Sequence, residues 1–160
     1  GFAFRNEAGR AINVIRASMP ISNLMKQKEF SNEMENYLNS INHSRNGSIH
    51  NIFSAIGHSR LVTNGTQLND ENNQPVVKDG LVGVHNGIIV NVDELWQRDG
   101  IGKRHYEIDT EVMFSLFRYF DKTYKSSIIS ISKSIQQIIG TVATAFFIDD
   151  KNELVLATNN

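Results

Sequence analysis

Residues 56–93, IGHSRLVTNGTQLNDENNQPVVKDGLVGVHNGIIVNVD, decide the fold of this chain. The apolar runs at 51–59 and 81–90 predict two strands, and the polar residues between them predict a loop. Strands and the loops at their ends hold side chains rigidly enough to form a site. Both runs carry side chains suited to a small polar ligand: His58, Ser59, Arg60, His85, Asn86 and Gly87.

Bulk composition limits the classes of partner. A length of 160 residues predicts one domain, spanning 1–160, with a full core. Sixteen basic and seventeen acidic residues give a net charge of −1, which argues against nucleic acid and against an anionic membrane surface as partners. There is no membrane-length apolar run and no signal-peptide pattern, so we expect a cytoplasmic protein that spans no membrane.

The chain contains no cysteine, which excludes disulfides, thiolate metal ligands and a cysteine nucleophile within these residues. The five histidines show no HExxH or HxH spacing, so no metal site is expected.

The remaining elements alternate between strands and helices. Strands are predicted at 1–4, 11–16, 141–148 and 153–158, and helices after Ser18–Pro20, at 32–40, at 91–97, from Asp109 onward and at 127–139. Gly140 is predicted to stop the last helix, with one apolar face formed by Ile128, Ile131, Ile135, Ile138 and Ile139. Hairpin-type links between most strands predict an α+β fold of antiparallel sheets layered with helices, rather than a doubly wound parallel sheet.

Arg60 directly follows an apolar strand, where its guanidinium could hold a carboxylate through two parallel hydrogen bonds. A surface salt bridge is the alternative. Thr63 and Asn64 could add donors to the same carboxylate, although Asn64-Gly65 is also a strong turn pair.

Asn86-Gly87 presents a side-chain amide beside a glycine N–H, a pair of donors suited to a developing oxyanion. A type I′ hairpin turn is the alternative for this dipeptide. Asp109 fits a helix N-cap, and it could instead bind the ammonium group of a ligand.

Four motifs together carry a resemblance to a known family: GHSRLVTNG (57–65), NNQP (72–75), VHNGIIVN (84–91) and DTEV (109–112). In order and spacing they resemble the glutaminase domain of class II glutamine amidotransferases, and most closely glucosamine-6-phosphate synthase and amidophosphoribosyltransferase. The resemblance implies the fold of the N-terminal-nucleophile hydrolases, an αββα sandwich of two antiparallel sheets between helix layers.

The resemblance also implies roles for individual residues. Arg60, Thr63 and Asn64 would bind the α-carboxylate of glutamine, and Asp109 would bind its α-ammonium group with help from the Gly87 backbone. Asn86 and Gly87 would form the oxyanion hole. No cofactor is implied, and the partners would be glutamine and a synthase domain or subunit that receives the ammonia.

The chain departs from the family at two points. The family's nucleophile is an N-terminal cysteine, so we expect a fragment that lacks the nucleophile strand, is incomplete at both ends and is inactive by itself. Leu61 and Asn64 stand where the sugar-synthase branch has tryptophan and histidine, which leaves coupling to a synthase open. The alternative is a non-catalytic amino-acid-binding or interaction module of the same fold.

Overall fold

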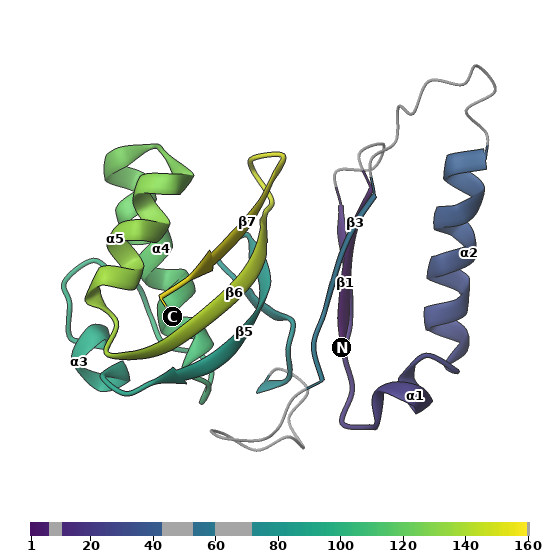
Figure 1. Cartoon of the computed structure of the whole chain (residues 1–160), viewed down its shortest axis with the longest axis horizontal. Coiled ribbons are helices and arrows are strands. Elements are labelled where there is room, and N and C mark those ends of the chain that lie inside the picture. The colour runs from purple at the N-terminus through teal and green to yellow at the C-terminus, as the bar shows by residue number, and fades with distance from the viewer. Residues whose placement is uncertain (7–10, 43–52, 60–71, 160) are drawn as a thin grey trace.

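The computed structural model describes residues 1–6, 11–42, 53–59 and 72–159, and these form two antiparallel sheets (Figure 1). The first sheet has the order β2-β1-β3, and the second has the order β4-β5-β6-β7. The strands are β1 (Phe2–Asn6), β2 (Ile12–Ile15), β3 (Phe53–Gly57), β4 (Val76–Lys78), β5 (Leu81–Ile89), β6 (Gly140–Ile148) and β7 (Glu153–Thr158). The helices are α1 (Ile21–Leu24), α2 (Lys28–Asn42), α3 (Val92–Trp96), α4 (Thr110–Tyr124) and α5 (Ser127–Gln137).

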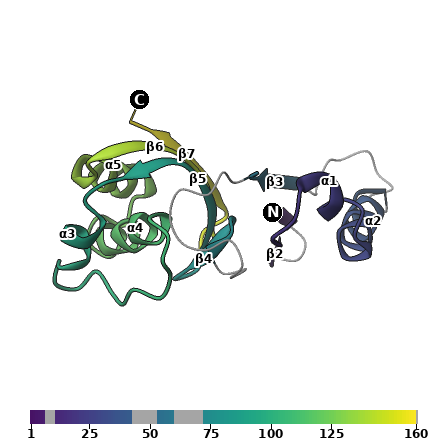
Figure 2. The same cartoon turned by 90° about the horizontal axis from the view of Figure 1, so that it is seen from below.

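The two sheets face each other, with helices on their outer sides (Figure 1). Helix α2 runs along the outer side of the first sheet, and α4 and α5 cover the outer side of the second. Figure 2 shows the same order of layers from below. The αββα sandwich expected from the sequence is therefore confirmed.

Side chains of the first sheet alternate between two cores. Phe4 points outward and its ring lies 5.9 Å from the rings of both Phe30 and Phe53, within the core under α2. Ala3 points inward and packs with Phe147 of the second sheet. Because side chains alternate along β1, one face of the first sheet packs against α2 and the other packs against the second sheet.

The larger core lies between the second sheet and α4. Phe114 and Phe117 of α4 are fully buried, and their rings lie 5.3 Å and 5.0 Å from that of Phe146 on β6. Truncating a buried phenylalanine to alanine typically costs about 3–5 kcal/mol, so this packing fixes α4 on the sheet. The beginning of α4 is thereby held beside the end of β5, where the candidate site lies.

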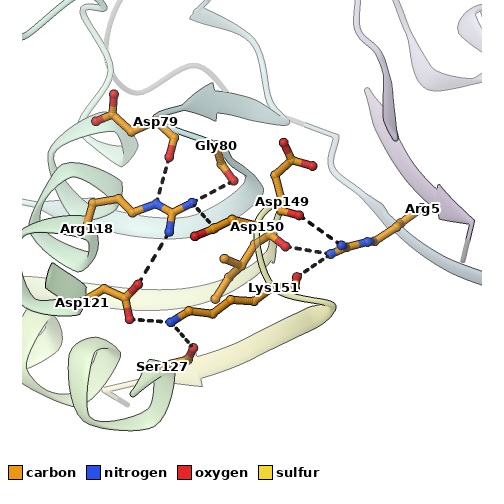
Figure 3. Close-up of polar contacts among 10 residues, drawn as sticks. Arg5, Asp79, Gly80, Arg118, Asp121, Ser127, Asp149, Asp150 and Lys151 are labelled. Carbon is orange, nitrogen blue, oxygen red and sulfur yellow. Dashed lines mark hydrogen bonds and ion pairs between the residues drawn. The ribbon is translucent and has the colours of Figure 1, made fainter. Parts of the chain in front are cut away.

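Arg5 connects the two sheets at the end distant from that site (Figure 3). Its side chain is 6% exposed, and its Nη1 atom donates to the carbonyl oxygens of Ile148 at 2.8 Å and Lys151 at 3.0 Å. A buried guanidinium needs such acceptors, and the β6–β7 turn supplies them. This contact joins β1 to residues more than 140 positions later in the chain.

Most predicted elements are confirmed within one to three residues, and the differences have local causes. Strand β4 was not predicted, because three residues, VVK, are too short to show a period. Helix α2 begins at Lys28, earlier than expected. Helix α1 begins after Pro20, as predicted, and Pro20 is its N-cap residue. The polar stretch at 43–50, whose composition predicts a loop, lies outside the described residues.

The predicted apolar face of α5 is confirmed in part, because Ile131 and Ile138 are buried in the core and Ile135 packs against it. Ile128, however, is 81% exposed. Two serines share the buried side, and the Ser130 and Ser134 hydroxyls donate to the Ser126 and Ser130 carbonyl oxygens at 2.7 Å. Because each hydroxyl has this acceptor, the two serines can be buried at little cost.

The end of α5 also differs from the prediction. The helix ends at Gln137, and Ile138 is already extended, so Gly140 opens β6 and is not the predicted helix stop. Ile139, which follows the helix, is 60% exposed.

Candidate functional site

A cavity of about 570 Å³ lies where the end of β3, the second half of β5 and the beginning of α4 meet. This volume is in the ordinary range for small-molecule sites. We call it the β5 cavity. It is lined by Gly57, His58, Ser59, Gln74, His85, Asn86, Gly87, Ile88, Ile108, Asp109, Thr110 and Thr141. The sequence places these residues far apart, and the fold brings Asn86, Gly87 and Asp109 to one cavity.

Asn86-Gly87 lies inside β5, paired with Ala143 and Val142 of β6, so the hairpin-turn alternative is wrong. Asn86 is exposed and continues the row of Val82 and Val84, which face the first sheet. Its amide is therefore presented to the space between the sheets.

Gly87 has a φ of +148°, a backbone conformation that residues with a side chain rarely adopt. An added Cβ would also meet the Thr141 carbonyl oxygen and lie 2.7 Å from His85 Nε2. The position therefore requires glycine both for its backbone and for the absence of a side chain.

Two backbone N–H groups along one edge of β5 donate to side chains that line the cavity. The N–H of His85 donates to Gln74 Oε1 at 2.6 Å, and the N–H of Ile89 donates to Asp109 Oδ2 at 2.9 Å. Because N–H directions alternate along a strand, the N–H of Gly87 points to the same edge as its neighbours two residues away. Gly87 thus presents a backbone donor where the cavity lies.

Asp109 is the N-cap residue of α4, as predicted, but its side chain makes no capping hydrogen bond. Oδ2 is bound to the Ile89 N–H, whereas Oδ1 lies 3.9 Å from His85 Nδ1. The residue is only 8% exposed and lines the cavity. A carboxylate held in this way offers an oxygen to a cationic ligand group.

His85 is packed below the Asn86-Gly87 pair and is 3% exposed. Its Nδ1 lies 3.3 Å from Thr110 Oγ1, and its Nε2 lies 3.2 Å from the Thr141 carbonyl oxygen. Both ring nitrogens are thus engaged, and the ring connects β5 to α4 and β6.

Three predicted site residues, Arg60, Thr63 and Asn64, lie outside the described residues. Ser59, the neighbour of Arg60, lines the β5 cavity. Reasoning from single residues missed Gln74, Thr110 and Thr141. For Gln74 and Thr110 signals existed in the NNQP and DTEV motifs, whereas Thr141 is an ordinary strand residue whose position only the fold reveals.

The described part of the chain has neither a metal-binding cluster nor a membrane-spanning helix. Within 1–6, 11–42, 53–59 and 72–159, no group of three or more histidine, aspartate or glutamate side chains could hold a metal ion. None of the helices in these ranges has the length and apolar character needed to cross a bilayer.

Comparison with known proteins identifies the class that this fold and site define. A family model described as a glutamine amidotransferase domain matches residues 58–160, more than half of the chain. The chain therefore belongs to the glutamine amidotransferase family, and its fold and relatives place it in class II.

Two relatives are glutamine–fructose-6-phosphate aminotransferases (isomerizing). The protein from Mesorhizobium japonicum is 33% identical over 110 residues, and that from Chlamydia pneumoniae is 31% identical over 111 residues. Each alignment covers 66% of this chain and 18% of the relative. The chain thus spans less than a fifth of the length of the curated relatives that it matches.

A solved structure has a similar fold. It is the glutamine phosphoribosylpyrophosphate amidotransferase from B. subtilis, complexed with ADP and GMP. It is 28% identical with a TM-score of 0.52, over 65% of this chain and 22% of that chain.

Proposed function

We propose that this chain is the glutamine-binding part of a class II amidotransferase that releases ammonia from the glutamine side chain. The observation that carries the proposal is the meeting of Asn86, Gly87 and Asp109 around one cavity. Arg60 follows Ser59, which lines the same cavity, and is proposed to bind the α-carboxylate together with Thr63 and Asn64. Asp109 would bind the α-ammonium group through its oxygen that is not bound to Ile89.

The proposed chemistry is acyl transfer. A cysteine thiolate from outside these residues attacks the side-chain carbonyl carbon of glutamine, and the carbonyl oxygen becomes an oxyanion. The Asn86 amide and the Gly87 N–H donate to that oxygen. The C–N bond then breaks, the proton that the cysteine thiol gave up on forming the thiolate moves to the leaving nitrogen, and ammonia departs. Water then hydrolyses the thioester to glutamate and the free thiol.

Opposite charges at the two ends of the cavity would explain selection of free glutamine. A peptide-bound glutamine lacks both the free α-ammonium and the free α-carboxylate group, so it would offer no cation to Asp109 and no anion to Arg60. The charge-assisted hydrogen bonds proposed at both ends would then not form. We propose that the ammonia passes to an acceptor in a synthase domain or partner subunit.

Ammonia release from L-glutamine by the complete gene product tests this function. We expect wild-type protein to release ammonia and the Arg60→Ala and Asp109→Ala variants to lose most of kcat/KM. Arg104→Ala is a suitable control, because Arg104 is 42% exposed and pairs with Asp93 at the surface. Full activity of both site variants would overturn the assignment of the two charged groups.

The second candidate is an amino-acid-binding module without catalysis. It would bind L-glutamine with an affinity that depends on Asp109, yet release no ammonia. Calorimetry and the ammonia assay on the same preparation distinguish the two functions.

A further inference from the structure

Gln74 lies two residues before the beginning of β4, and its side chain hydrogen-bonds to the backbone of β5. Val76, the first residue of β4, pairs with Gly83, so His85 is the next residue of β5 whose backbone N–H and carbonyl groups face this edge. The Gln74 side chain makes the two hydrogen bonds that a strand residue would make there. Its Oε1 accepts the His85 N–H at 2.6 Å, and its Nε2 donates to the His85 carbonyl oxygen at 2.8 Å. An amide side chain offers the same donor and acceptor as a peptide group.

This pairing fixes the backbone directly before the proposed oxyanion hole. The His85 carbonyl group and the Asn86 N–H belong to one planar peptide unit, so holding the oxygen orients the unit that carries Asn86. Gln74 is only 8% exposed, and its amide is directed at β5 although the residue lines the cavity. Its amide oxygen and nitrogen are thus engaged with the backbone, which favours an effect through His85 over direct contact with a ligand.

Asn72 makes a similar paired contact with the other half of the site. Its Nδ2 donates to Glu107 Oε2 at 3.1 Å, and its Oδ1 accepts the Glu107 N–H at 3.3 Å. Asn72 is 1% exposed, and Glu107 lies two residues before Asp109. One short buried segment thus contacts the chain just before each half of the site.

Building on the proposed function, we propose that Gln74 and Asn72 are positioning residues with separable effects. Gln74 acts through His85 on the oxyanion donors Asn86 and Gly87, and therefore on the chemical step. Asn72 acts through Glu107 on Asp109, and therefore on binding of the α-ammonium group.

Three variants of the complete protein separate these effects. Gln74→Met and Asn72→Leu remove the paired hydrogen bonds at similar side-chain size. Asn73→Leu is the matched control, because Asn73 is also 8% exposed but donates to Ser18 Oγ at 3.2 Å, away from β5 and Asp109. All three lose buried hydrogen bonds, so similar losses of thermal stability are expected.

Kinetics and inhibition then report the two ends of glutamine separately. L-Norvaline has the α-ammonium and α-carboxylate groups of glutamine but no amide, so its inhibition constant reports how well these two groups are bound. We expect Gln74→Met to lower kcat by about tenfold to hundredfold, since small misplacements of catalytic groups have effects of that size, and to leave the norvaline constant within threefold. We expect Asn72→Leu to raise the norvaline constant by about tenfold, and Asn73→Leu to change neither value more than about threefold.

Gln74→Glu provides a readout that general loosening would not give. The protonated carboxylic acid has one donor and one acceptor, as the amide has, whereas the carboxylate cannot donate to the His85 carbonyl oxygen. The kcat of this variant relative to wild type should therefore rise as the pH falls. The kcat of Gln74→Met relative to wild type should not change with pH.

The outcomes separate the two proposals. No ammonia from the wild-type protein overturns the proposed function and this inference with it. With an active wild type, equal kinetic losses in Gln74→Met and Asn73→Leu, or a flat pH ratio for Gln74→Glu, overturn the role of Gln74. An unchanged norvaline constant in Asn72→Leu overturns the role of Asn72.

Discussion

Oδ2 of Asp109 accepts a hydrogen bond from the backbone N–H of Ile89 at 2.9 Å, between residues 20 positions apart. The bond joins the beginning of α4 to the end of β5, and it replaces the local helix cap that the sequence predicts. The carboxylate is consequently held at the cavity wall rather than folded back onto its own helix. A structural contact and a proposed ligand contact thus share one side chain.

Replacing Asp109 by asparagine should separate these two roles. Asparagine keeps an oxygen that can accept the Ile89 N–H, so the free energy of unfolding should change by less than about 1 kcal/mol. Loss of the charge should weaken L-norvaline binding by about tenfold to hundredfold, because hydrogen bonds to charged groups contribute about 1.5–3 kcal/mol. Calorimetry measures the affinity for L-norvaline, and urea unfolding measures the free energy of unfolding. Unchanged affinity would refute the ammonium-binding role.

Gly87→Ala should disrupt the site more than an equivalent change elsewhere. The new Cβ would meet the Thr141 carbonyl oxygen and lie 2.7 Å from His85 Nε2 at a positive φ. Strained backbone of this kind costs about 1–3 kcal/mol, and the clash adds to it. Gly102→Ala is the control, since Gly102 also has a positive φ but no atom lies within 4 Å of its added Cβ. Equal losses of stability in denaturant unfolding would contradict the clash.

Lys78→Met should destabilise the fold strongly, because it leaves the Glu111 carboxylate buried without its cation. The pair is 2.9 Å apart with side chains 4% and 0% exposed, so an expected loss of about 3–5 kcal/mol follows. The Lys78→Met/Glu111→Gln double variant should lose less than the sum of the single variants in urea unfolding.

The surface pair Arg104–Asp93 is the control for that experiment. Its side chains are 42% and 89% exposed, and Asp93→Asn should cost less than about 1 kcal/mol. Additive effects in the buried pair would show that Lys78 and Glu111 are not coupled. Because Glu111 also accepts the N–H groups of His105 and Tyr106 at 2.8 Å and 2.7 Å, such variants should loosen the loop before Asp109 as well.

Asp150 should make a small contribution to stability that disappears in acid. The hydrogen bond from Arg118, at 2.7 Å, lowers the pKa of Asp150 below its ordinary value of 3.8 (Figure 3). A lowered pKa in the folded state means that the stabilisation is present above 3.8 and is lost as the pH falls through the folded value. The side chain is 63% exposed, so the effect should stay below about 1 kcal/mol.

Unfolding curves of wild type and Asp150→Asn over this acid range test the effect. The difference in unfolding free energy should shrink towards low pH. A difference that grows on acidification would contradict the pairing with Arg118.

Strong local patterns allowed most elements to be predicted from the sequence. The apolar run of β5 and the turn between β6 and β7 are visible because a strand period and turn-forming residues occur together. Strand β4 carries too few residues for a period, and its pairing with β5 is a non-local contact. The burial of Ser130 and Ser134 on α5 could not be read either, because serines whose hydroxyls bind carbonyl oxygens of their own helix are indistinguishable in a sequence from solvent-exposed serines.

By itself, the sequence determined the layered α+β architecture and the identity of Asn86, Gly87 and Asp109 as candidates. Periodicity and residue chemistry are local properties, and they are written in the order of the residues. Only the tertiary structure decided that Asp109 binds Ile89 instead of its own helix, and that Gln74 pairs with His85. Such hydrogen bonds join groups distant along the chain, and their partners are chosen by how the sheets and helices pack.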